Sequence, residues 1–331
     1  MHTILVTGGL GFIGSETVIA LIQAGYEPIV VDDLYNAKEA VLDRIETITH
    51  VRPTFYKVDV TKKKETEAIF KAHKIDAVIH FAGYKAVGES VYKPIEYYQN
   101  NLGSALNVLD VMRHYDVHNF IFSSSATVYG DGVSPLRETD ALLPTTNPYG
   151  ETKLMGERII TDYAKNKPNF AAALLRYFNP IGAHESGLIG EVPNGKPNNL
   201  MPFITQVAAK KRDKLSIFGN DYDTTDGTGV RDYIHVVDLA LGHIAALKNL
   251  KPGVNIYNLG TGQGVSVLEL VNAFMSVNKI DIPYEIVPRR AGDIAVCYAS
   301  TAKDIQELNF KTKKSTEDMV RDAWNFEKNL S

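Results

Sequence analysis

Short apolar runs and longer amphipathic stretches alternate along the first half of the chain. The apolar runs are uniform rather than alternating, and turn residues flank them, which predicts buried β-strands. They lie at residues 3–7, 28–31, 54–58, 77–81, 119–122 and 171–178. Helical periodicity fills most of the gaps, at residues 15–24, 62–73, 91–115 and 149–165. Buried strands separated by helices predict a parallel, doubly wound sheet with helices on both faces, and hence an α/β fold.

The pattern changes beyond residue 179. Residues 180–202 are rich in Gly, Asn and Pro, and short strand-like runs follow at 215–218, 253–259, 283–287 and 296–299. We therefore expect a first domain over 1–179 and a smaller, mixed α/β domain over 180–331 that caps the first and binds the substrate. Residues 232–247 resemble a strand end followed by a helix, so part of 232–262 could pack on the first sheet. The stretch from 311 predicts an amphipathic surface helix.

A glycine-rich turn follows the first strand directly. Gly8, Gly11 and Gly14 have the spacing G-x-x-G-x-x-G and stand between a strand and a helix. Such glycines permit a tight turn, the approach of a pyrophosphate and close packing of helix on strand. The anion would lie at the helix N-terminus, where unpaired N–H groups favour it. This context predicts a Rossmann-type dinucleotide site rather than an ordinary loop.

The second strand ends in Asp32 and Asp33. An acidic residue about 20 positions after the glycines is placed to bind the adenosine ribose, and it would repel a 2′-phosphate. The cofactor is therefore predicted to be NAD rather than NADP. The alternative is a strand-end aspartate that caps a turn.

Composition narrows the class of protein. The 331 residues carry a net charge of −4, are 44% hydrophobic and 22% charged, and contain no basic run interleaved with aromatic residues, which argues against a nucleic-acid partner. No signal-like segment or 18-residue apolar stretch is evident, so we expect a cytoplasmic protein with no membrane partner. The single cysteine rules out an internal disulfide, and the nine histidines form no metal-like cluster, so we expect no metal.

Three residues predict proton chemistry. Ser125 follows a buried strand, and Tyr149 and Lys153 are four residues apart at the start of a helical pattern, so they share one face. A neighbouring ammonium favours the phenolate and lowers the pKa of a tyrosine. A serine hydroxyl close by can hold the substrate oxygen that loses its proton. Taken alone, the pair would more often be a helix-start tyrosine and a surface lysine, and the dinucleotide site reverses that preference.

The chain resembles the extended short-chain dehydrogenase/reductase superfamily and, within it, the UDP-galactose 4-epimerase family. The resemblance covers essentially the whole chain, and several of its motifs belong to the epimerases in particular. The matching segments are TGGLGFIG (7–14), HFAGYKAVGESV (80–91), FSSSATVYG (122–130), PYGETK (148–153), LRYFNPIGAH (175–184), PNNLMP (197–202), FGNDY (218–222), DGTGVRDYIHV (226–236) and PRRAGD (288–293). Related 4,6-dehydratases carry an Asp-Glu pair where this chain has Ala126 and Thr127, which argues against dehydration.

The resemblance implies reversible epimerisation at carbon 4 of UDP-hexoses through a 4-keto sugar, with tightly bound NAD, in galactose metabolism. Tyr149 would be the general base, Lys153 would bind the nicotinamide ribose and lower the Tyr149 pKa, and Ser125 would bind the reacting oxygen. The implied cofactor residues are Gly8, Gly11, Phe12, Ile13, Gly14, Asp32, Asp33, Asn36, Asp59, Val60, Phe81, Ala82, Gly83, Lys85, Asn100, Tyr149, Lys153 and Phe178. The implied UDP-sugar residues are Ser125, Tyr149, Asn179, Asn199, Leu200, Arg231, Tyr233, Arg290, Asp293 and Cys297.

Two finer expectations come from the same resemblance. Cys297 occupies the position at which a large aromatic side chain excludes an N-acetyl group, so its small side chain predicts that UDP-N-acetylhexoses are also accepted. A homodimer is expected through the helical stretches 91–115 and 149–165, although a sheet-facing surface would explain much of the apolar face of the second stretch. Two other functions stay open: epimerisation of a different UDP-sugar, such as a pentose or a uronate, and a non-catalytic NAD-binding regulator.

Overall fold

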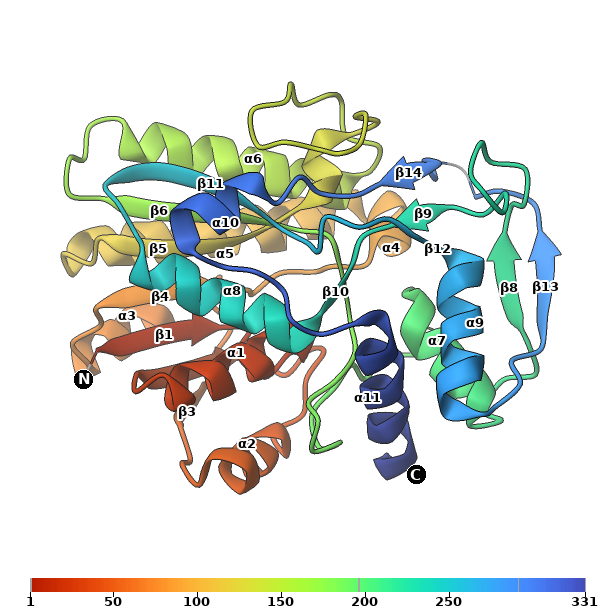
Figure 1. Cartoon of the computed structure of the whole chain (residues 1–331). Coiled ribbons are helices and arrows are strands. Elements are labelled where there is room, and N and C mark those ends of the chain that lie inside the picture. Colours follow the sequence, from red (N-terminus) through yellow and green to blue (C-terminus); the bar gives the residue numbers. More distant parts are fainter. Residues whose placement is uncertain (1, 196, 291, 331) are drawn as a thin grey trace.

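The computed structural model describes residues 2–195, 197–290 and 292–330 (Figure 1). A seven-stranded sheet in the order β11-β6-β5-β4-β1-β2-β3 forms its larger part, and every neighbouring pair is parallel. The strands are β1 (Thr3–Thr7), β2 (Glu27–Asp32), β3 (Thr54–Lys57), β4 (Ala77–His80), β5 (Asn119–Ser125), β6 (Ala171–Tyr177) and β11 (Gly253–Leu259). The predicted Rossmann-type α/β fold is confirmed.

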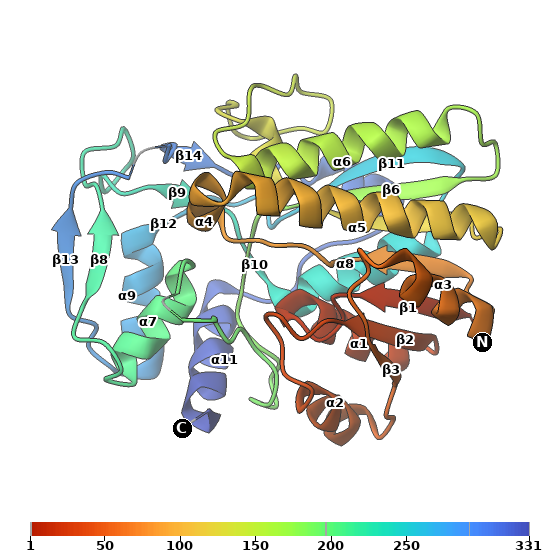
Figure 2. The same cartoon turned by 180° about the vertical axis from the view of Figure 1, so that it is seen from behind.

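Helices cover both faces of this sheet, as its uniformly apolar strands require. One apolar core joins the sheet to α1 (Phe12–Gln23), α2 (Val41–Thr49) and α8 (Val236–Lys248). A second core joins the opposite face to α3 (Lys63–Ala72), α5 (Pro94–His114) and α6 (Pro148–Ala164). Helices α5 and α6 run side by side across that face (Figure 2).

The C-terminal part has an apolar core of its own. It contains α7 (Leu200–Ala208), α9 (Val267–Asn278), α11 (Thr316–Asn329) and the strand pair β8 (Leu215–Phe218) and β13 (Tyr284–Val287). Small sheets lie between the two cores: β7 (Asn179–Ile181) pairs with β10 (Tyr233–His235), and β9 (Val230–Arg231) lies between β12 (Val265–Ser266) and β14 (Val296–Cys297). Helix α10 (Ala302–Leu308) packs on β11.

Two local differences from the sequence predictions have physical reasons. The predicted helix 91–115 is two helices, α4 (Val87–Tyr92) and α5, because Lys93 precedes a proline and leaves the helical conformation. Strand β5 continues to Ser125, where a loop was expected, because its terminal serines find buried hydrogen-bond partners. Strand β11 is the edge strand of the large sheet beside β6, so part of 232–262 packs on the first sheet, as the sequence analysis allowed.

No helix in the described ranges is both long and apolar enough to cross a lipid bilayer.

Candidate active site

The carboxyl ends of the parallel strands meet at one edge of the sheet, which brings the predicted site residues together. The glycine turn is tied to the next strand by a hydrogen bond from the Gly8 N–H to the Val31 carbonyl, at 2.7 Å. A Cβ on Gly14 would lie 2.2 Å from the Gly8 oxygen, so no other residue fits there. A Cβ on Gly11 would meet only that same oxygen, at 3.3 Å, and would otherwise enter open space.

Helix α1 begins at this turn without a side-chain cap and without an acidic residue in its first turn. Its first N–H groups and its dipole are therefore available to an anion. A side chain at position 11 would fill the open space beside the turn, which glycine leaves free. The turn fits the pyrophosphate of a dinucleotide on these structural grounds.

Asp32 lies beside the turn at the end of β2. Its two carboxylate oxygens accept hydrogen bonds from the N–H groups of Leu10 (3.1 Å) and Leu34 (2.9 Å). Burial raises the pKa of this carboxyl group. Asp32 therefore holds the loops around the site, and its remaining lone pairs can still accept from ribose hydroxyls. The turn-capping reading and the ribose-binding reading are compatible.

The other predicted cofactor residues line the same edge. The Ala82 N–H donates to the Thr7 hydroxyl at 3.3 Å, and Gly83 packs against the Asn101 side chain. The Phe81 ring lies 4.9 Å from the ring of His243 in α8. Asp59 accepts from both the N–H and the hydroxyl of Thr61. The remaining predicted cofactor residues are placed as follows.

Phe12 and Ile13 are the first two residues of α1, and Asp33 accepts a hydrogen bond from the Tyr35 N–H. The Asn100 amide donates to the Asn101 side chain. Asn36 is exposed, Val60 is buried, and Phe178 is buried beside Cys297.

The start of α6 places Tyr149 and Lys153. The Asn147 side chain caps the helix by accepting from the Gly150 N–H at 2.8 Å, and Pro148 occupies the first turn. Tyr149 is therefore in the first turn and Lys153 lies one turn later on the same face. The Lys153 ammonium is 5.8 Å from the centre of the Tyr149 ring and 5.1 Å from that of Phe122.

Lys153 is 7% exposed, and neutral oxygens hold its ammonium. Its Nζ donates to the Ser123 carbonyl oxygen at 2.6 Å and to the Ser123 hydroxyl at 3.2 Å. Burial lowers its pKa to about 8. Burial also raises the pKa of Tyr149, so the prediction that Lys153 makes this phenol more acidic than usual is not met in the protein alone. Burial is the larger influence on this phenol, and the one that opposes it is a hydrogen bond from Ser125.

Ser125 is oriented by Thr127, for which the sequence analysis predicts no catalytic role. Both the N–H and the hydroxyl of Thr127 donate to the Ser125 hydroxyl oxygen, at 3.3 and 3.0 Å. The Ser125 proton is therefore free to donate elsewhere, and its hydrogen bond to Tyr149 lowers the pKa of that phenol against the effect of burial. This places a donating serine against the proposed base.

A buried ion pair fixes the adjoining strands to α6. Arg176 of β6 donates to both oxygens of Glu157 at 2.9 and 2.7 Å, and Ser124 donates to Glu157 at 2.5 Å. The guanidinium also lies 4.7 Å from the centre of the Tyr129 ring. Ser124 and Arg176 are register partners in the sheet. Glu157 is one turn beyond Lys153, so this pair fixes the helix that carries the proposed base.

One carboxylate joins two residues that were assigned to different ligands. Glu191 Oε1 lies 2.8 Å from the Lys85 ammonium and 2.8 Å from the Asn199 amide. Lys85 was predicted to bind the cofactor and Asn199 the UDP-sugar. Both side chains therefore contact the same anionic group in this structure.

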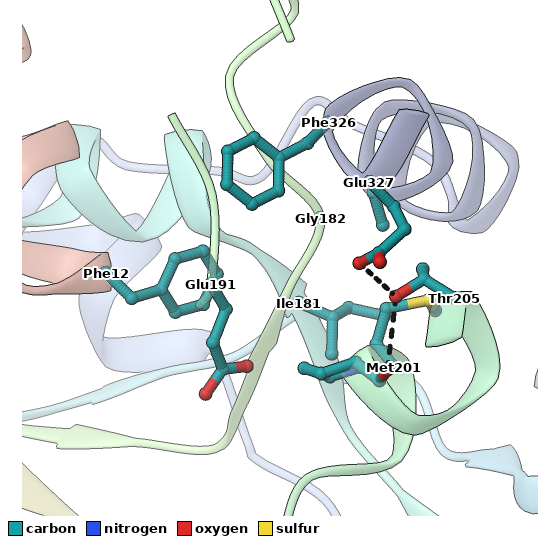
Figure 3. Close-up of a pocket in the computed structure, with 10 residues that line it drawn as sticks. Phe12, Ile181, Gly182, Glu191, Met201, Thr205, Phe326 and Glu327 are labelled. Atoms are coloured by element: carbon teal, nitrogen blue, oxygen red, sulfur yellow. Dashed lines mark hydrogen bonds between the residues drawn. The ribbon is translucent and has the colours of Figure 1, made fainter. Parts of the chain in front are cut away.

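Figure 3 shows a small cavity beside Glu191 and Phe12. Its volume of about 20 Å³ admits a single water molecule, so it is not the cofactor or sugar site. Thr205 of α7 and Glu327 of α11, which are hydrogen-bonded at 3.1 Å, lie on its far side. Ile181, Met201 and Ala323 of the C-terminal apolar core line it together with Phe12 of α1.

The predicted UDP-sugar residues come from the small sheets and their loops. Arg231 of β9 pairs in register with Cys297 of β14, and Arg290 forms an ion pair with Asp293 at 2.9 Å. Both guanidinium groups lie near Tyr233, where they oppose the effect of burial that raises its pKa to about 12. Arg290 also lies over the Phe218 ring at 4.7 Å. Three further members lie nearby in the chain: Asn179 begins β7, Asn199 precedes α7, and Leu200 is its first residue.

Within the described residues, no cluster of His, Cys, Asp and Glu side chains could hold a metal ion.

A family model described as "NAD dependent epimerase/dehydratase family" matches residues 4–260. A UDP-glucose 4-epimerase of Haemophilus influenzae is 53% identical over 329 residues, which are 98% of this chain and 97% of that protein. The match thus spans nearly the whole of both chains, and the resemblance noted in the sequence is confirmed.

Solved structures agree. A UDP-glucose 4-epimerase from Bifidobacterium longum in complex with NAD⁺ and UDP has a TM-score of 0.96 and 50% identity, and the match covers 99% of this chain and 98% of that one. A UDP-Glc/GlcNAc 4-epimerase from Campylobacter jejuni has a TM-score of 0.86 and 36% identity, with 99% and 100% covered.

Replacing Thr127 by Val tests its role in orienting Ser125. Val keeps the shape of the side chain and the backbone N–H but removes the second donor to the Ser125 oxygen. Loss of one hydrogen bond is expected to reduce kcat with UDP-galactose roughly five- to tenfold, with little change in KM. Thr127→Ser retains the hydroxyl and should retain kcat. A wild-type kcat in Thr127→Val would contradict this role.

Proposed function

The chain belongs to the NAD dependent epimerase/dehydratase family, and we infer that its reaction is the reversible inversion of carbon 4 of UDP-hexoses, which interconverts UDP-glucose and UDP-galactose. The observation that carries this inference is the arrangement of Ser125, whose proton is free to donate, against the Tyr149 phenol, with the buried Lys153 ammonium beside them. A non-catalytic regulator would have no use for this arrangement. Ala126 and Thr127 stand where a dehydratase would carry two acids.

NAD is the cofactor. The glycine turn would hold its pyrophosphate, Asp32 its adenosine ribose and Lys153 its nicotinamide ribose. When it is bound, NAD supplies hydride chemistry at carbon 4 of the sugar.

The proton steps belong to the chain's own residues. Tyr149 takes the proton of the sugar 4-hydroxyl, and Ser125 donates a hydrogen bond to the reacting oxygen. Together with the hydride chemistry that NAD would supply at carbon 4, this proton transfer converts the alcohol into a 4-keto sugar, which turns over in the pocket and presents its other face. Tyr149 then returns the proton to the same oxygen, so the enzyme ends each turnover in its starting state.

The sugar can turn only if the nucleotide end stays fixed. Arg231 and Arg290 would bind the diphosphate, because a guanidinium pairs with phosphate oxygens through a planar fork of donors. Their common proximity to Tyr233 supports a shared anion site. Asn179 and Asn199 would contact the same ligand. Binding energy at the UDP end thus leaves the hexose free to rotate.

Tyr149→Phe tests the reaction itself. The purified protein should convert UDP-galactose to UDP-glucose, with product stereochemistry read by NMR, and the variant should lose at least two orders of magnitude in kcat. Absorbance near 340 nm after addition of a UDP-sugar reports transient reduction of the nicotinamide. Absence of conversion in the native protein, or full activity in Tyr149→Phe, would overturn the proposed function.

We further propose that the sugar pocket accepts a 2-N-acetyl group. Cys297 is 9% exposed and packs among Val128, Leu136 and Phe178, and burial raises the pKa of its thiol to about 11, so it acts as a small apolar side chain. The C. jejuni relative, named for both UDP-Glc and GlcNAc, supports this breadth.

Cys297→Tyr should abolish turnover of UDP-N-acetylglucosamine and leave that of UDP-galactose largely unchanged, because the larger ring fills the space beside the sugar. Rates with both substrates measure the effect, and Cys297→Ser serves as the size-matched control. Equal and negligible N-acetyl turnover in the native enzyme and in Cys297→Tyr would exclude the wider specificity.

We also propose a homodimer through α5 and α6. Apolar side chains stand exposed along α4 and α5: Tyr92 at 87%, Ile95 at 63% and Leu106 at 51%. Ile95 and Leu106 are three helical turns apart and therefore lie on one stripe, which suits a two-fold helix interface. A cytoplasmic location is also proposed, because the free thiol Cys297 suits a reducing compartment.

Ile95→Glu combined with Leu106→Glu should convert a dimer into a monomer, because two charges would be buried on the shared stripe. Sedimentation equilibrium measures the mass. Ile305→Glu, which changes an exposed apolar residue on α10, should remain dimeric. A monomeric native protein would remove this proposal.

A further inference from the structure

Two buried titratable side chains lie directly beneath the proposed site and have no part in the mechanism above. Tyr177 is the last residue of β6 and is 7% exposed, while His243 of α8 is fully buried. The Tyr177 hydroxyl lies 2.5 Å from His243 Nε2. The Phe81 ring packs against the same imidazole. This pair connects α8 to the edge of the sheet at which the chemistry is expected.

The direction of the Tyr177–His243 hydrogen bond is fixed by the other ring nitrogen. His243 Nδ1 lies 2.8 Å from the Leu239 carbonyl oxygen, which can only accept, so Nδ1 carries the proton. Burial lowers the pKa of His243 to about 4, so the ring is neutral and Nε2 is an acceptor. Tyr177 must therefore donate its proton to His243.

Ser123 is the next member of this chain of hydrogen bonds. In the sheet Ser125 pairs with Tyr177, and Ser123, two residues earlier, projects from the same face. Ser123 thus lies diagonally across from Tyr177 on this face, and its hydroxyl, as a hydrogen-bond partner, opposes the rise in the Tyr177 pKa that burial causes. Because the Tyr177 proton is committed to His243, Ser123 is the donor in this bond. Its oxygen can then offer only lone pairs to other groups.

The group that receives these lone pairs is Lys153. Its ammonium faces both the Ser123 hydroxyl and the Ser123 carbonyl oxygen. The other titratable groups around it are Tyr149 of its own helix, His80 of β4, which burial keeps neutral, and Tyr177 of β6. Across the described chain no carboxylate is bonded to Lys153. Its charge thus depends on two neutral acceptors, one of which could turn and become a donor.

We propose that Tyr177 and His243 are positioning residues, which hold the Ser123 hydroxyl in the orientation that accepts a hydrogen bond from the Lys153 ammonium. The chain of donors runs Lys153, Ser123, Tyr177, His243 and ends at the Leu239 carbonyl inside α8. It therefore leads no proton to solvent. This suits a reaction in which the proton taken from the sugar is returned to it. The catalytic consequence of this inference rests on the proposed function. The orientation of Ser123 is independent of that function.

Tyr177→Phe tests the chain in the NAD-loaded enzyme. Without the Tyr177 oxygen, Ser123 is free to turn its proton toward Lys153, which disfavours the charged form of the lysine. The pKa of Lys153 should fall by about one unit, the size expected for one lost hydrogen bond to a charged group. Because activity needs the ammonium, the alkaline limb of the kcat profile should move to lower pH by the same amount, with KM for UDP-galactose little changed.

His243→Phe provides a second variant, which keeps a ring against Phe81 but removes the acceptor, and it should shift the limb in the same direction. His243→Gln offers a carbonyl oxygen near the position of Nε2 and should restore most of the native profile. Tyr257→Phe is the matched control. Tyr257 is equally buried on the neighbouring strand β11, and its hydroxyl donates to Glu307, so its loss should leave the limb in place.

A direct readout separates this inference from the proposed function. Lysine labelled with ¹³C at Cε is followed by NMR against pH in the NAD-loaded protein, and the Lys153 signal is identified by its loss in Lys153→Met. A lower Lys153 pKa in Tyr177→Phe and His243→Phe, but not in Tyr257→Phe, supports the inference even if no UDP-hexose is turned over. An unchanged Lys153 pKa in both variants overturns it, whatever the activity of the native enzyme.

Discussion

The structure of the site depends on the buried ammonium of Lys153, to which no carboxylate among the described residues is bonded. A charge removed from water needs close, correctly directed acceptors, or its pKa shifts until it is lost. Burial lowers the pKa of Lys153 to about 8, and among the described residues its ammonium donates hydrogen bonds only to the two oxygens of Ser123. The position of α6, the end of β5 and the packing beneath them can all be understood as means of keeping this group in place.

The three serines at the end of β5 each contact a different part of the site. Successive residues of a strand face opposite sides of the sheet, so Ser124 meets the Glu157–Arg176 pair on the α6 side, while Ser123 and Ser125 face the side of α8. Ser124 thus anchors the helix that carries the base, Ser123 accepts from Lys153, and Ser125 is left to donate toward Tyr149. A shift of register by one residue would exchange these faces and destroy all three contacts at once.

The large sheet, the glycine turn and the proposed base could be predicted because each is written in local sequence: uniformly apolar strands, glycine spacing, and a tyrosine and lysine four residues apart. Thr127, Ser123 and Glu191 carry no such signal. Their roles depend on contacts that only the strand register or a distant loop creates. Glu191, for example, contacts Lys85 although more than one hundred residues separate them in sequence. The break before Pro94 was visible in the sequence, since a residue that precedes proline avoids the helical conformation, and the apolar periodicity on both sides concealed it.

The pKa shifts of Tyr149 and Lys153 indicate what the positive charge of bound NAD would add to the proposed site. In the chain alone, burial raises the pKa of Tyr149 and lowers that of Lys153, so both shifts favour the neutral phenol and the neutral amine. The Ser125 hydrogen bond opposes the rise in the Tyr149 pKa, and the two Ser123 oxygens favour the charged form of Lys153. Neither contact brings the pKa of the phenol below its ordinary value. A positive charge bound beside the phenol would supply the missing stabilisation of the phenolate. As the proposed base, Tyr149 would therefore lose its proton most readily beside bound NAD, which is also the molecule that would accept the hydride.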